Sequence, residues 1–495
     1  MKKFIVLGSG TAGLVAATMI KKRWGDQVKV SLYYDSKKKN IGVGESTTPT
    51  ITYFLKGYLK VDLNDFLNDT GSTIKLGINF KNWIPGTEYF HGFREVDFSP
   101  SHYPESLYSI LTGVYDGGMN YSKATSTLPS HQFHFLHALH IDTQAFSNYV
   151  QEKIEKEIEI IDDVAEKVNI DGENIQSIIF KKSGEVKADF YIDASGFNAV
   201  LLRELNPKWN DISKKLPIDK AIPQQVPYDF TEVPSHTLSE ATSDGWVWQI
   251  PIGKRYGTGY LYSSKFTSDE EAREKYNQWL IKNLNAELET DKIIQYKPGY
   301  YSEHWIGNCM AVGLSSGFVE PLEATGIHII VQQMKDFIEY NPTLNNLKYN
   351  RMECNRRHSS LYEEIIEFVC LHYNTNRTDS DFWRYMTENK TDWVRAFDQK
   401  CREEFLEESS IRRGKEFWHV DSYIQVAQGL RMFNPDSIQR FLDSLPNGEE
   451  ILENCKSRYT EVKNAKNRNL SVPHRSVLFG KSMIIDINRD KISFV

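Results

Sequence analysis

A glycine-rich loop between a short apolar strand and a helix constrains the fold more than any other feature of the sequence. Residues 3–7 form an apolar run that suits a buried parallel strand, and a helical pattern begins at Ala12. Three glycines at the spacing of a phosphate-binding loop lie between them, at Gly8, Gly10 and Gly13. In such a loop the N–H groups at the helix start can bind a pyrophosphate. The sequence therefore predicts an α/β fold that binds a dinucleotide, with an ordinary tight turn as the alternative.

The helix leads to a second expected strand, residues 28–34. At the end of this strand a carboxylate can hydrogen-bond the adenosine ribose of a dinucleotide. Asp35 occupies that place if the spacing is counted from Gly13, whereas alignment on the downstream segment Gly42-Val-Gly-Glu45 puts Tyr34 there. Both residues therefore stay candidates for the ribose contact.

Composition and charge narrow the classes of function. The 495 residues exceed one ordinary core, so we expect two or more packed regions. A net charge of −7 argues against a nucleic-acid partner, which would need a basic surface. The five cysteines are odd in number and form no CxxC pair, so we expect neither a metal site nor a disulfide framework, and a reducing, cytoplasmic location. Glycines interrupt the apolar N-terminal run and no apolar window reaches about 18 residues, which argues against a secretory signal and a membrane span.

The pattern of apolar residues changes character near residue 345. Before it, a strand pattern is expected within 190–197, with antiparallel or edge strands near 157–161 and 176–181. After the turn-rich stretch 341–346, apolar residues recur at helical spacing. The expected division is a body over 1–345, with inserted substrate-side segments at about 60–145 and 200–300, and a mainly helical substrate-side region over 346–495.

Residues 245–251 read Gly-Trp-Val-Trp-Gln-Ile-Pro, an uncommon string in which two tryptophans are separated by one residue and followed by Ile-Pro. Further glycine-containing segments accompany it: Gly42-Val-Gly-Glu45, Asp193-Ala-Ser-Gly196, the stretch 307–321, and Glu320-Pro-Leu-Glu-Ala-Thr-Gly326. Together with the N-terminal loop, these segments resemble flavin-dependent halogenases of the tryptophan halogenase type. The resemblance covers residues 3–335 well and the helical remainder loosely.

This resemblance implies an FAD-binding, Rossmann-like flavoprotein monooxygenase fold with mixed β-sheets and a helical C-terminal region. It also implies that FAD contacts the N-terminal loop, the end of the second strand and the later glycine segments. The residues are Gly8, Gly10, Thr11, Ala12, Gly13, Asp35, Gly44, Glu45, Gly313, Pro321, Gly326 and Ile327. Because the chain has no second glycine loop for a nicotinamide cofactor, reduced FAD is expected from a separate NAD(P)H-dependent flavin reductase.

Lys75 matches the catalytic lysine of the family and lies in a stretch that alternates like a strand. Burial would favour its neutral amine, which can hydrogen-bond hypohalous acid or form a haloamine. An exposed strand lysine is the alternative, and Lys81 is the nearest rival. The resemblance assigns Glu323 to halogen delivery or to accepting the ring proton, with Glu320 as its alternative.

The halide and the oxidant also have expected places. Thr325 and Gly326 match the halide site of the family, where N–H donors and a hydroxyl at a helix start suit chloride, bromide or iodide. Trp246, Trp248 and Pro251 match residues that border a tunnel and keep an organic substrate away from the flavin. Two tryptophans on one face of a strand are otherwise ordinary core residues.

The expected substrate residues are aromatic. His91, Phe93 and Trp418 match side chains that hold an indole between their faces. The groups that clamp the amino-acid end of free tryptophan find no match near residues 406–413. Free tryptophan is therefore not the expected substrate, and another indole, a phenol or a larger aromatic molecule is favoured.

The resemblance implies a two-component reaction. Reduced FAD and oxygen oxidise halide to hypohalous acid, which passes through a tunnel to Lys75 for electrophilic halogenation of an electron-rich aromatic ring. The rival interpretations are an FAD-dependent aromatic hydroxylase and a catalytically inactive flavin-binding protein. The expected partners are the reductase and a small aromatic substrate, with neither nucleic acid nor membrane, and self-association is left open.

Overall fold

The computed structural model of the protein describes residues 1–37, 44–93, 137–229, 233–404, 406, 417–454, 457, 483–486 and 491–494. These residues divide into two compact units, each assembled from three stretches of the chain. Unit 1 comprises Met1–Ser72, Leu139–Leu216 and Gln295–Glu363, and unit 2 comprises Thr73–Ala138, Pro217–Ile294 and Glu364–Val495.

Parallel strands form the centre of unit 1. β1 (Lys2–Leu7) pairs in parallel with β2 (Val28–Tyr34) on one side and with β12 (Phe190–Asp193) on the other. α1 (Thr11–Trp24) connects β1 to β2 and packs against these strands, so that residues 13–20 are all buried. The strand–helix–strand unit predicted from the glycine loop is therefore confirmed.

The same sheet continues at both edges. β8 (Glu159–Asp162) pairs in parallel with β2, while β21 (Cys309–Ala311) follows β12 in parallel and β20 (Trp305–Ile306) follows β21 in antiparallel orientation. A separate antiparallel sheet contains β9 (Ala165–Asp171), β10 (Asn174–Phe180) and β11 (Gly184–Val186). The edge and antiparallel strands expected near 157–161 and 176–181 are thus confirmed.

The other elements in or at the border of unit 1 are short, except for three helices. They are η1 (Gly25–Gln27), β3 (Glu45–Ser46), α2 (Thr50–Tyr53), the π-helix η2 (Phe54–Leu59), α3 (Leu63–Thr70), β7 (Ala138–Ile141), α6 (Thr143–Ile154), η4 (Gly196–Asn198), η5 (Leu202–Leu205), β13 (Trp209–Asp211), β19 (Gly299–Tyr301), η6 (Gly313–Ser315), β22 (Gly317–Phe318) and α8 (Gly326–Tyr340). Of these, α8 packs against α1.

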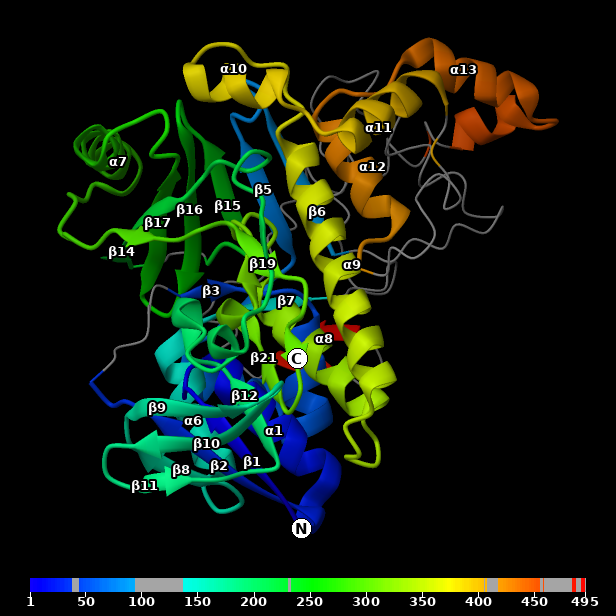
Figure 1. Ribbon diagram of the computed structural model, residues 1–495. Coiled ribbons are helices and arrows are strands. Elements are labelled where there is room, and N and C mark those ends of the chain that lie inside the picture. The colour runs from blue at the N-terminus through cyan, green and yellow to red at the C-terminus, as the bar shows by residue number, and fades with distance from the viewer. Residues whose placement is uncertain are drawn as a thin grey trace. The chain divides into compact units, whose positions relative to one another are not determined.

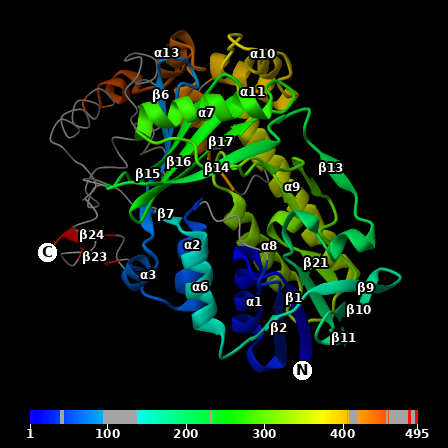
Figure 2. The same ribbon diagram turned by 90° about the vertical axis from the view of Figure 1, so that its left-hand side faces the viewer.

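Unit 2 is built on one large sheet. In spatial order its strands are β18 (Ile294–Gln295), β14 (Lys220–Pro227), β17 (Arg255–Tyr262), β16 (Gly245–Ile252), β15 (His236–Ala241), β5 (Gly77–Lys81) and β6 (Glu88–Gly92). From β14 to β6 the neighbours are antiparallel, except that β15 and β5 run parallel. Figures 1 and 2 show α7 (Asp269–Leu284) along one face of this sheet, against which it packs Ala272, Tyr276 and Leu280.

The later part of unit 2 is mainly helical, as the spacing of its apolar residues predicted. Its helices are the portion 364–372 of α9 (Lys348–His372), α10 (Asp381–Glu388), α11 (Asp392–Glu403), α12 (Val420–Gly429) and α13 (Pro435–Ser444). The remaining strands are β4 (Thr73–Lys75) and the hairpin of β23 (Met483–Asp486) with β24 (Lys491–Phe494). The protein is therefore an α/β protein with mixed sheets and a helical C-terminal region.

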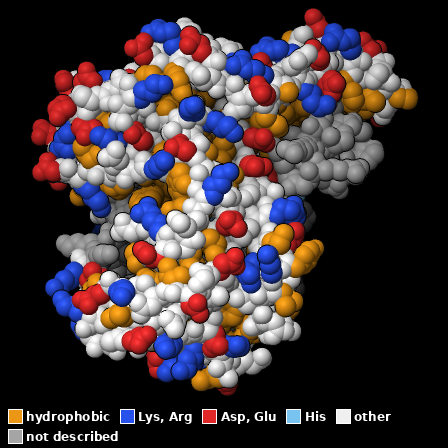
Figure 3. Space-filling model, in the orientation of Figure 1, with side chains coloured by type: hydrophobic (Ala, Val, Ile, Leu, Met, Phe, Trp, Pro, Cys, Tyr) orange, Lys and Arg blue, Asp and Glu red, His pale blue; other side chains and the backbone are white. Residues whose placement is uncertain are grey.

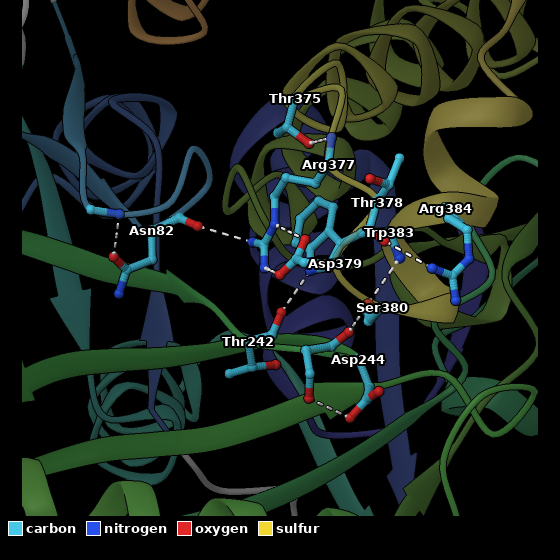
Figure 4. Close-up of polar contacts among 12 residues, drawn as sticks. Asn82, Thr242, Asp244, Thr375, Arg377, Thr378, Asp379, Ser380, Trp383 and Arg384 are labelled. Atoms are coloured by element: carbon cyan, nitrogen blue, oxygen red, sulfur yellow. Dashed lines mark hydrogen bonds and ion pairs between the residues drawn. The ribbon is translucent and has the colours of Figure 1, made fainter.

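A cluster of polar contacts ties α10 to the sheet of unit 2 (Figure 4). The Arg377 guanidinium lies 4.0 Å from the centroid of the Trp383 ring. It also binds both carboxylate oxygens of Asp379 and donates to the Asn82 carbonyl at 3.0 Å. The Trp383 indole donates to the Thr242 carbonyl at 2.7 Å, in the turn between β15 and β16. The helix is thus held by directed contacts in addition to apolar burial.

Charged side chains of both signs are intermixed on the face shown in Figure 3, and hydrophobic side chains gather there only in small groups. The acidic excess of the sequence is thus not concentrated in one field among the described residues of that face. Within the described ranges, no helix has the length and apolarity needed to cross a membrane.

Candidate active site

The loop formed by residues 8–13 in unit 1 is closed so tightly that two of its glycines leave no room for a side chain. A Cβ on Gly8 would lie 2.2 Å from the Ala194 carbonyl oxygen, and one on Gly13 would lie 1.8 Å from the Gly8 oxygen. Gly8 also has a φ of +120°, which favours glycine. Gly10 caps α1 without a side-chain hydrogen bond, and the first turn, which begins at Thr11, carries no acidic residue. The backbone amides of this turn therefore suit the pyrophosphate of a dinucleotide.

A buried carboxylate sets the turn that follows β12. Asp193 accepts hydrogen bonds from the Ser195 amide at 3.0 Å and from the Ser195 hydroxyl at 2.6 Å. Its other oxygen accepts from the amides of Leu201 and Leu202 at 2.8 and 2.9 Å. One side chain thus fixes the backbone against which the glycine loop is closed.

The turn that begins at Gly313 meets the same loop. A Cβ on Gly313 would come within 3.0 Å of the Ala12 Cβ, and its φ of +60° also favours glycine. The Ser315 hydroxyl donates to the Gly196 carbonyl at 3.1 Å. Three segments that are far apart in the sequence therefore converge in unit 1.

A glutamine on α8 holds the turn at Gly313 from behind. The Gly313 amide donates to Gln333 Oε1 at 3.1 Å, and Gln333 Nε2 donates to the Ser316 hydroxyl at 2.7 Å. Gln333 Nε2 also lies 3.2 Å from His358 Nδ1, and the His358 ring stacks on His304 with centroids 3.9 Å apart. Burial lowers the pKa of His304 to about 4 and that of His358 well below its ordinary value. Both imidazoles are therefore neutral near pH 7.

The predicted halide residues lie at the start of a helix. α8 begins at Gly326, Thr325 is its N-cap residue, and Thr325 makes no side-chain capping bond. Its first turn carries no acidic residue. Ala324, just before it, has a φ of +58°, an uncommon conformation for a residue with a Cβ. Ile327 is buried beside the exposed Gly326. This backbone geometry suits an anion.

Both candidate acids on the preceding segment are buried. Glu323 is 4% exposed and Glu320 is 1% exposed, whereas Pro321 between them is exposed. Because burial is nearly equal, Glu320 stays the alternative to Glu323 for the proton-accepting role.

The segment around Gly44 approaches α8 through a side-chain contact. Gly44 has a φ of +86°, and Glu45 lies in β3, which pairs with β7. Desolvation raises the pKa of Glu45 to about 7. The Thr50 hydroxyl lies 2.7 Å from His328 Nδ1, which connects α2 to the first turn of α8. Residues 42–43 of the same motif lie outside the described residues.

The ribose candidates lie at the carboxyl end of β2. Tyr34 is the last residue of the strand, and its carbonyl accepts from the Asp163 amide at 2.8 Å. Asp35 Oδ1 accepts from the Lys37 amide at 3.0 Å and closes the turn. In Rossmann-like sheets this edge, next to the first strand, is where the ribose binds.

Lys75 ends β4 in unit 2 and is fully buried, with an exposed fraction of 0%. Its Nζ lies 5.0 Å from the centroid of the half-buried Phe93 ring. The Thr73 hydroxyl donates to the Pro251 carbonyl at 2.6 Å, which ties β4 to the tryptophan-bearing strand β16. Two sequence motifs that are far apart therefore meet within unit 2.

The rival lysine faces different surroundings. Lys81 Nζ forms an ion pair with Glu240 at 3.1 Å and is partly exposed. Glu240 also accepts from Trp279 Nε1 of α7 at 3.0 Å, so this pair lies on the face of the sheet that α7 covers. Lys81 is thus occupied by a structural contact.

The two tryptophans of the motif lie on the opposite face of the same sheet. Val247 packs in the cluster that contains α7, so its neighbours Trp246 and Trp248 point away from α7. Their rings are 6.4 Å apart, and both are buried. A Cβ on Gly259 would lie 2.1 Å from the Trp248 indole, so the glycine on the neighbouring strand makes room for that ring.

Strand register places a predicted substrate residue on this tryptophan face. Ser239 lies opposite Trp248 on one side and opposite Phe80 on the other, and Ile78 lies opposite His91. Residues opposite each other in a sheet share a face, and so do residues two apart on one strand. The side chains of Trp248, Phe80 and His91 therefore share one face.

Trp418 packs against a residue that the sequence analysis did not single out. Its ring stacks on Phe368 of α9 with centroids 4.0 Å apart, and the His91 ring lies 5.5 Å from Phe368. The structure thus gathers His91, Phe93, Lys75 and Trp418 in unit 2. Among residues 406–413 only Leu406 is described, and it is buried.

Three residues with a role in these sites were not predicted from the sequence, and they differ in whether a sequence feature could have pointed to them. Asp193 stood inside a recognised motif, and only its hydrogen bonds reveal its role. Gln333 is a polar residue at a buried position of α8, between the buried Val331 and Met334, which is a usable sign. Phe368 has no local signal, because a buried phenylalanine in a helix is ordinary core.

Comparison with known proteins agrees with this architecture. The profile of the tryptophan halogenase family matches residues 3–447. The tryptophan 6-halogenase SttH of Streptomyces toxytricini is 28% identical over 424 residues, which cover 77% of this chain and 80% of that protein. The tryptophan 7-halogenase RebH of Lentzea aerocolonigenes is 27% identical over 505 residues, which cover 91% of this chain and 93% of that protein. The solved structure of Xcc4156, a flavin-dependent halogenase from Xanthomonas campestris, superposes with a TM-score of 0.84 at 25% identity. The match covers 97% of this chain and 98% of that one. The chain therefore belongs to the tryptophan halogenase family of flavin-dependent enzymes.

Proposed function

We propose that this enzyme halogenates an electron-rich aromatic ring of the indole or phenol type, rather than free tryptophan, with Lys75 positioning the halogenating species. The observation that carries the proposal is the complete burial of Lys75 beside the Phe93 ring. Lysine is almost never fully buried, because its ammonium group is strongly hydrated. A buried amine that borders an aromatic ring is therefore more readily explained by chemistry than by stability.

The cofactor would be held by unit 1. The backbone of residues 8–13 would bind the pyrophosphate, Asp35 the ribose, and Gly44, Glu45 and the turn at Gly313 the remainder of FAD. The tight closure of the glycine loop and the uncapped first turn of α1 support this assignment. When bound, reduced FAD and oxygen supply the oxidising power that converts halide into hypohalous acid. A separate NAD(P)H-dependent reductase would supply the reduced flavin.

The chain's own residues would divide the remaining work. The Thr325 hydroxyl and the Gly326 amide would bind the halide, and Trp246 and Trp248 would keep the organic substrate away from the flavin. Hypohalous acid would pass through an internal tunnel to Lys75, whose Nζ would hold it over the substrate ring. A ring carbon would then bond the halogen as the halogen–oxygen bond breaks and the oxygen leaves as hydroxide. The ring would lose its proton to Glu323, so that the net by-product is water.

The test is mass spectrometry of reactions that contain the protein, FAD, NADH and a general flavin reductase. A panel of indoles and phenols is incubated separately with chloride, bromide and iodide. A halogen mass shift that requires the protein supports the proposal and ranks both substrates and halides. A gain of one oxygen would favour an aromatic hydroxylase, and no product despite bound FAD across the panel would contradict the proposed substrate class.

A further inference from the structure

The Trp418 indole, expected to stack on the substrate, is covered by the protein itself. The Phe368 ring stacks on it at 4.0 Å between centroids with 22° between the planes. The Phe417 ring approaches it at 4.0 Å with 61° between the planes. Trp418 is only 8% exposed as a result. A ligand ring could stack on this indole only if Phe368 or Phe417 moved.

One face of α9 holds both the ring and the backbone of Trp418. Glu364 accepts from the Trp418 amide at 3.1 Å and from the Phe417 amide at 3.3 Å. Glu364 and Phe368 are four positions apart on the helix, so they lie on the same side of it. Phe368 itself is fully buried and also meets Tyr423 edge-on at 5.0 Å. The stack is therefore a fixed part of the core.

The second expected stacking residue is buried as well. His91 is 4% exposed and contacts Phe368, with centroids 5.5 Å apart. Only the third, Phe93, is half-buried, and it is the ring beside Lys75 Nζ. Of the three aromatic side chains, the ring with accessible surface is thus the one next to the amine.

We propose that Phe368 determines the size of the substrate ring, because it occupies the place beside Trp418 and His91 where the second ring of a fused system would stack. The enzyme then favours a single-ring aromatic substrate of the phenol type, held on Phe93, over a two-ring indole. This inference rests on the proposed function and names the substrate class within it. Removing part of the phenyl ring opens an apolar space that aromatic molecules can fill.

The experiment compares Phe368→Leu and Phe368→Met with a matched control, Phe382→Leu. Phe382 is a fully buried phenylalanine of α10 whose ring packs on Phe266, Tyr373 and Trp383. Each protein is first checked for its folding transition and for FAD binding. Halogenation of indole and of phenol is then measured as kcat/KM, and the affinity for each of the two compounds is measured by calorimetry on the FAD-loaded protein without reductase.

We expect the indole-to-phenol ratio of kcat/KM to rise about tenfold or more in both Phe368 variants, the scale of discrimination seen for small changes in an apolar pocket. The indole affinity should rise with it, while Phe382→Leu keeps the wild-type ratio. An unchanged ratio, or an equal rise in the control, would overturn the inference. If the wild-type protein halogenates no member of the indole and phenol panel, the proposed function fails, and the calorimetric ratio of indole to phenol still decides the role of Phe368. The Met variant also removes the phenyl ring, and its flexible side chain makes it the second test if the Leu variant does not fold.

Discussion

Most candidate cofactor and halide residues of unit 1 come in short continuous runs, at 8–13, 44–45 and 325–327, and act through backbone, whereas Asp35, Gly313 and Pro321 are single positions. The candidate substrate residues of unit 2 are single side chains, supplied by 73–93, 246–251, 364–368 and 417–418. In unit 1 a glycine is required because a neighbouring carbonyl lies too close, as at Gly8. In unit 2 an aromatic ring matters because of the ring beside it, as for Trp418.

This difference explains why one half of the enzyme is easier to recognise than the other. A backbone-built site needs a local sequence pattern, which survives in any chain that keeps the turn. A site built from distant side chains can exchange its members while the fold stays the same. Substitutions in the two units should therefore separate cofactor binding from halogenation.

The largest separation is expected for Lys75→Met. Halogenated product should fall by about 10³-fold or more, within the range for loss of a positioned catalytic group, while FAD affinity stays at the wild-type value. Lys81→Met is the control, because Lys81 lies in an ion pair with Glu240 on the sheet face that α7 covers, and it should keep product formation within about threefold. Product yield and FAD titration on both variants measure this, and a loss of FAD affinity in Lys75→Met would break the separation.

Gly8→Ala should have the next largest effect, and it should lower FAD affinity rather than the halogenation step. The added Cβ would meet the Ala194 carbonyl oxygen, so FAD affinity should fall by about 10²-fold or more. Gly86→Ala in unit 2 is the matched control, because Gly86 also has a positive φ, of +76°, but nothing lies within 4 Å of an added Cβ. It should cost about 1 kcal/mol of unfolding free energy and leave FAD affinity unchanged. Equal losses of FAD affinity in both variants would show that backbone strain at a positive φ, rather than the contact of the added Cβ with the Ala194 carbonyl, lowers FAD affinity.

Acid should destabilise unit 1 through its stacked imidazoles. The pKa values of His304 and His358 are lowered by burial, so near pH 6.5 and below the unfolded chain binds protons that the folded chain does not. Above pH 6.5 the two imidazoles therefore cost no unfolding free energy. As the pH drops toward 4, the unfolding free energy falls by up to about 1.4 kcal/mol per pH unit for each imidazole.

Hydrogen exchange at pH 5 and 7 checks this for each unit separately. Amides of α8 and β21 should lose more protection than those of β16 and β17. His304→Phe keeps a ring on His358 and removes one titrating group, so the slope of stability with pH should become shallower. An unchanged slope would mean that other groups cause the acid sensitivity.

The smallest effect is expected for Thr73→Val, which removes the hydrogen bond from β4 to the Pro251 carbonyl. One such bond contributes about 0.5–1.5 kcal/mol, so kcat should fall about three- to tenfold as Lys75 becomes less well placed. FAD affinity should not change, and Thr73→Ser should restore the rate. Steady-state kinetics measure kcat for both variants. If Thr73→Ser, which keeps the hydroxyl, is as slow as Thr73→Val, the loss of kcat comes from altered packing and not from the missing hydrogen bond.

Much of unit 1 could be predicted because local patterns fix its structure. The apolar run 3–7 and the glycines after it predicted β1, the loop and α1, and the Thr325-Gly326 pair was expected at a helix start, where α8 begins. Lys75 was singled out through its surroundings in the sequence, and its burial fits that choice. Phe368 and Glu364 could not be found, because their importance depends on a residue 50 or more positions away that packs on them. The parallel pairing of β15 with β5 is equally invisible to local patterns.

That parallel pairing also constrains how the protein is made. Residues 77–81 can pair early with 88–92, but they stay without the strand on their other side until 236–240 have been synthesised. The face that carries Trp246 and Trp248 also cannot be finished before 364–372 emerge, because Phe368 and His372 pack on its rings. Pairings between distant stretches slow folding and leave apolar surface open meanwhile. The nascent chain thus holds an unfinished aromatic sheet for much of its synthesis, and we expect slower translation or added chaperone to raise the yield of active enzyme.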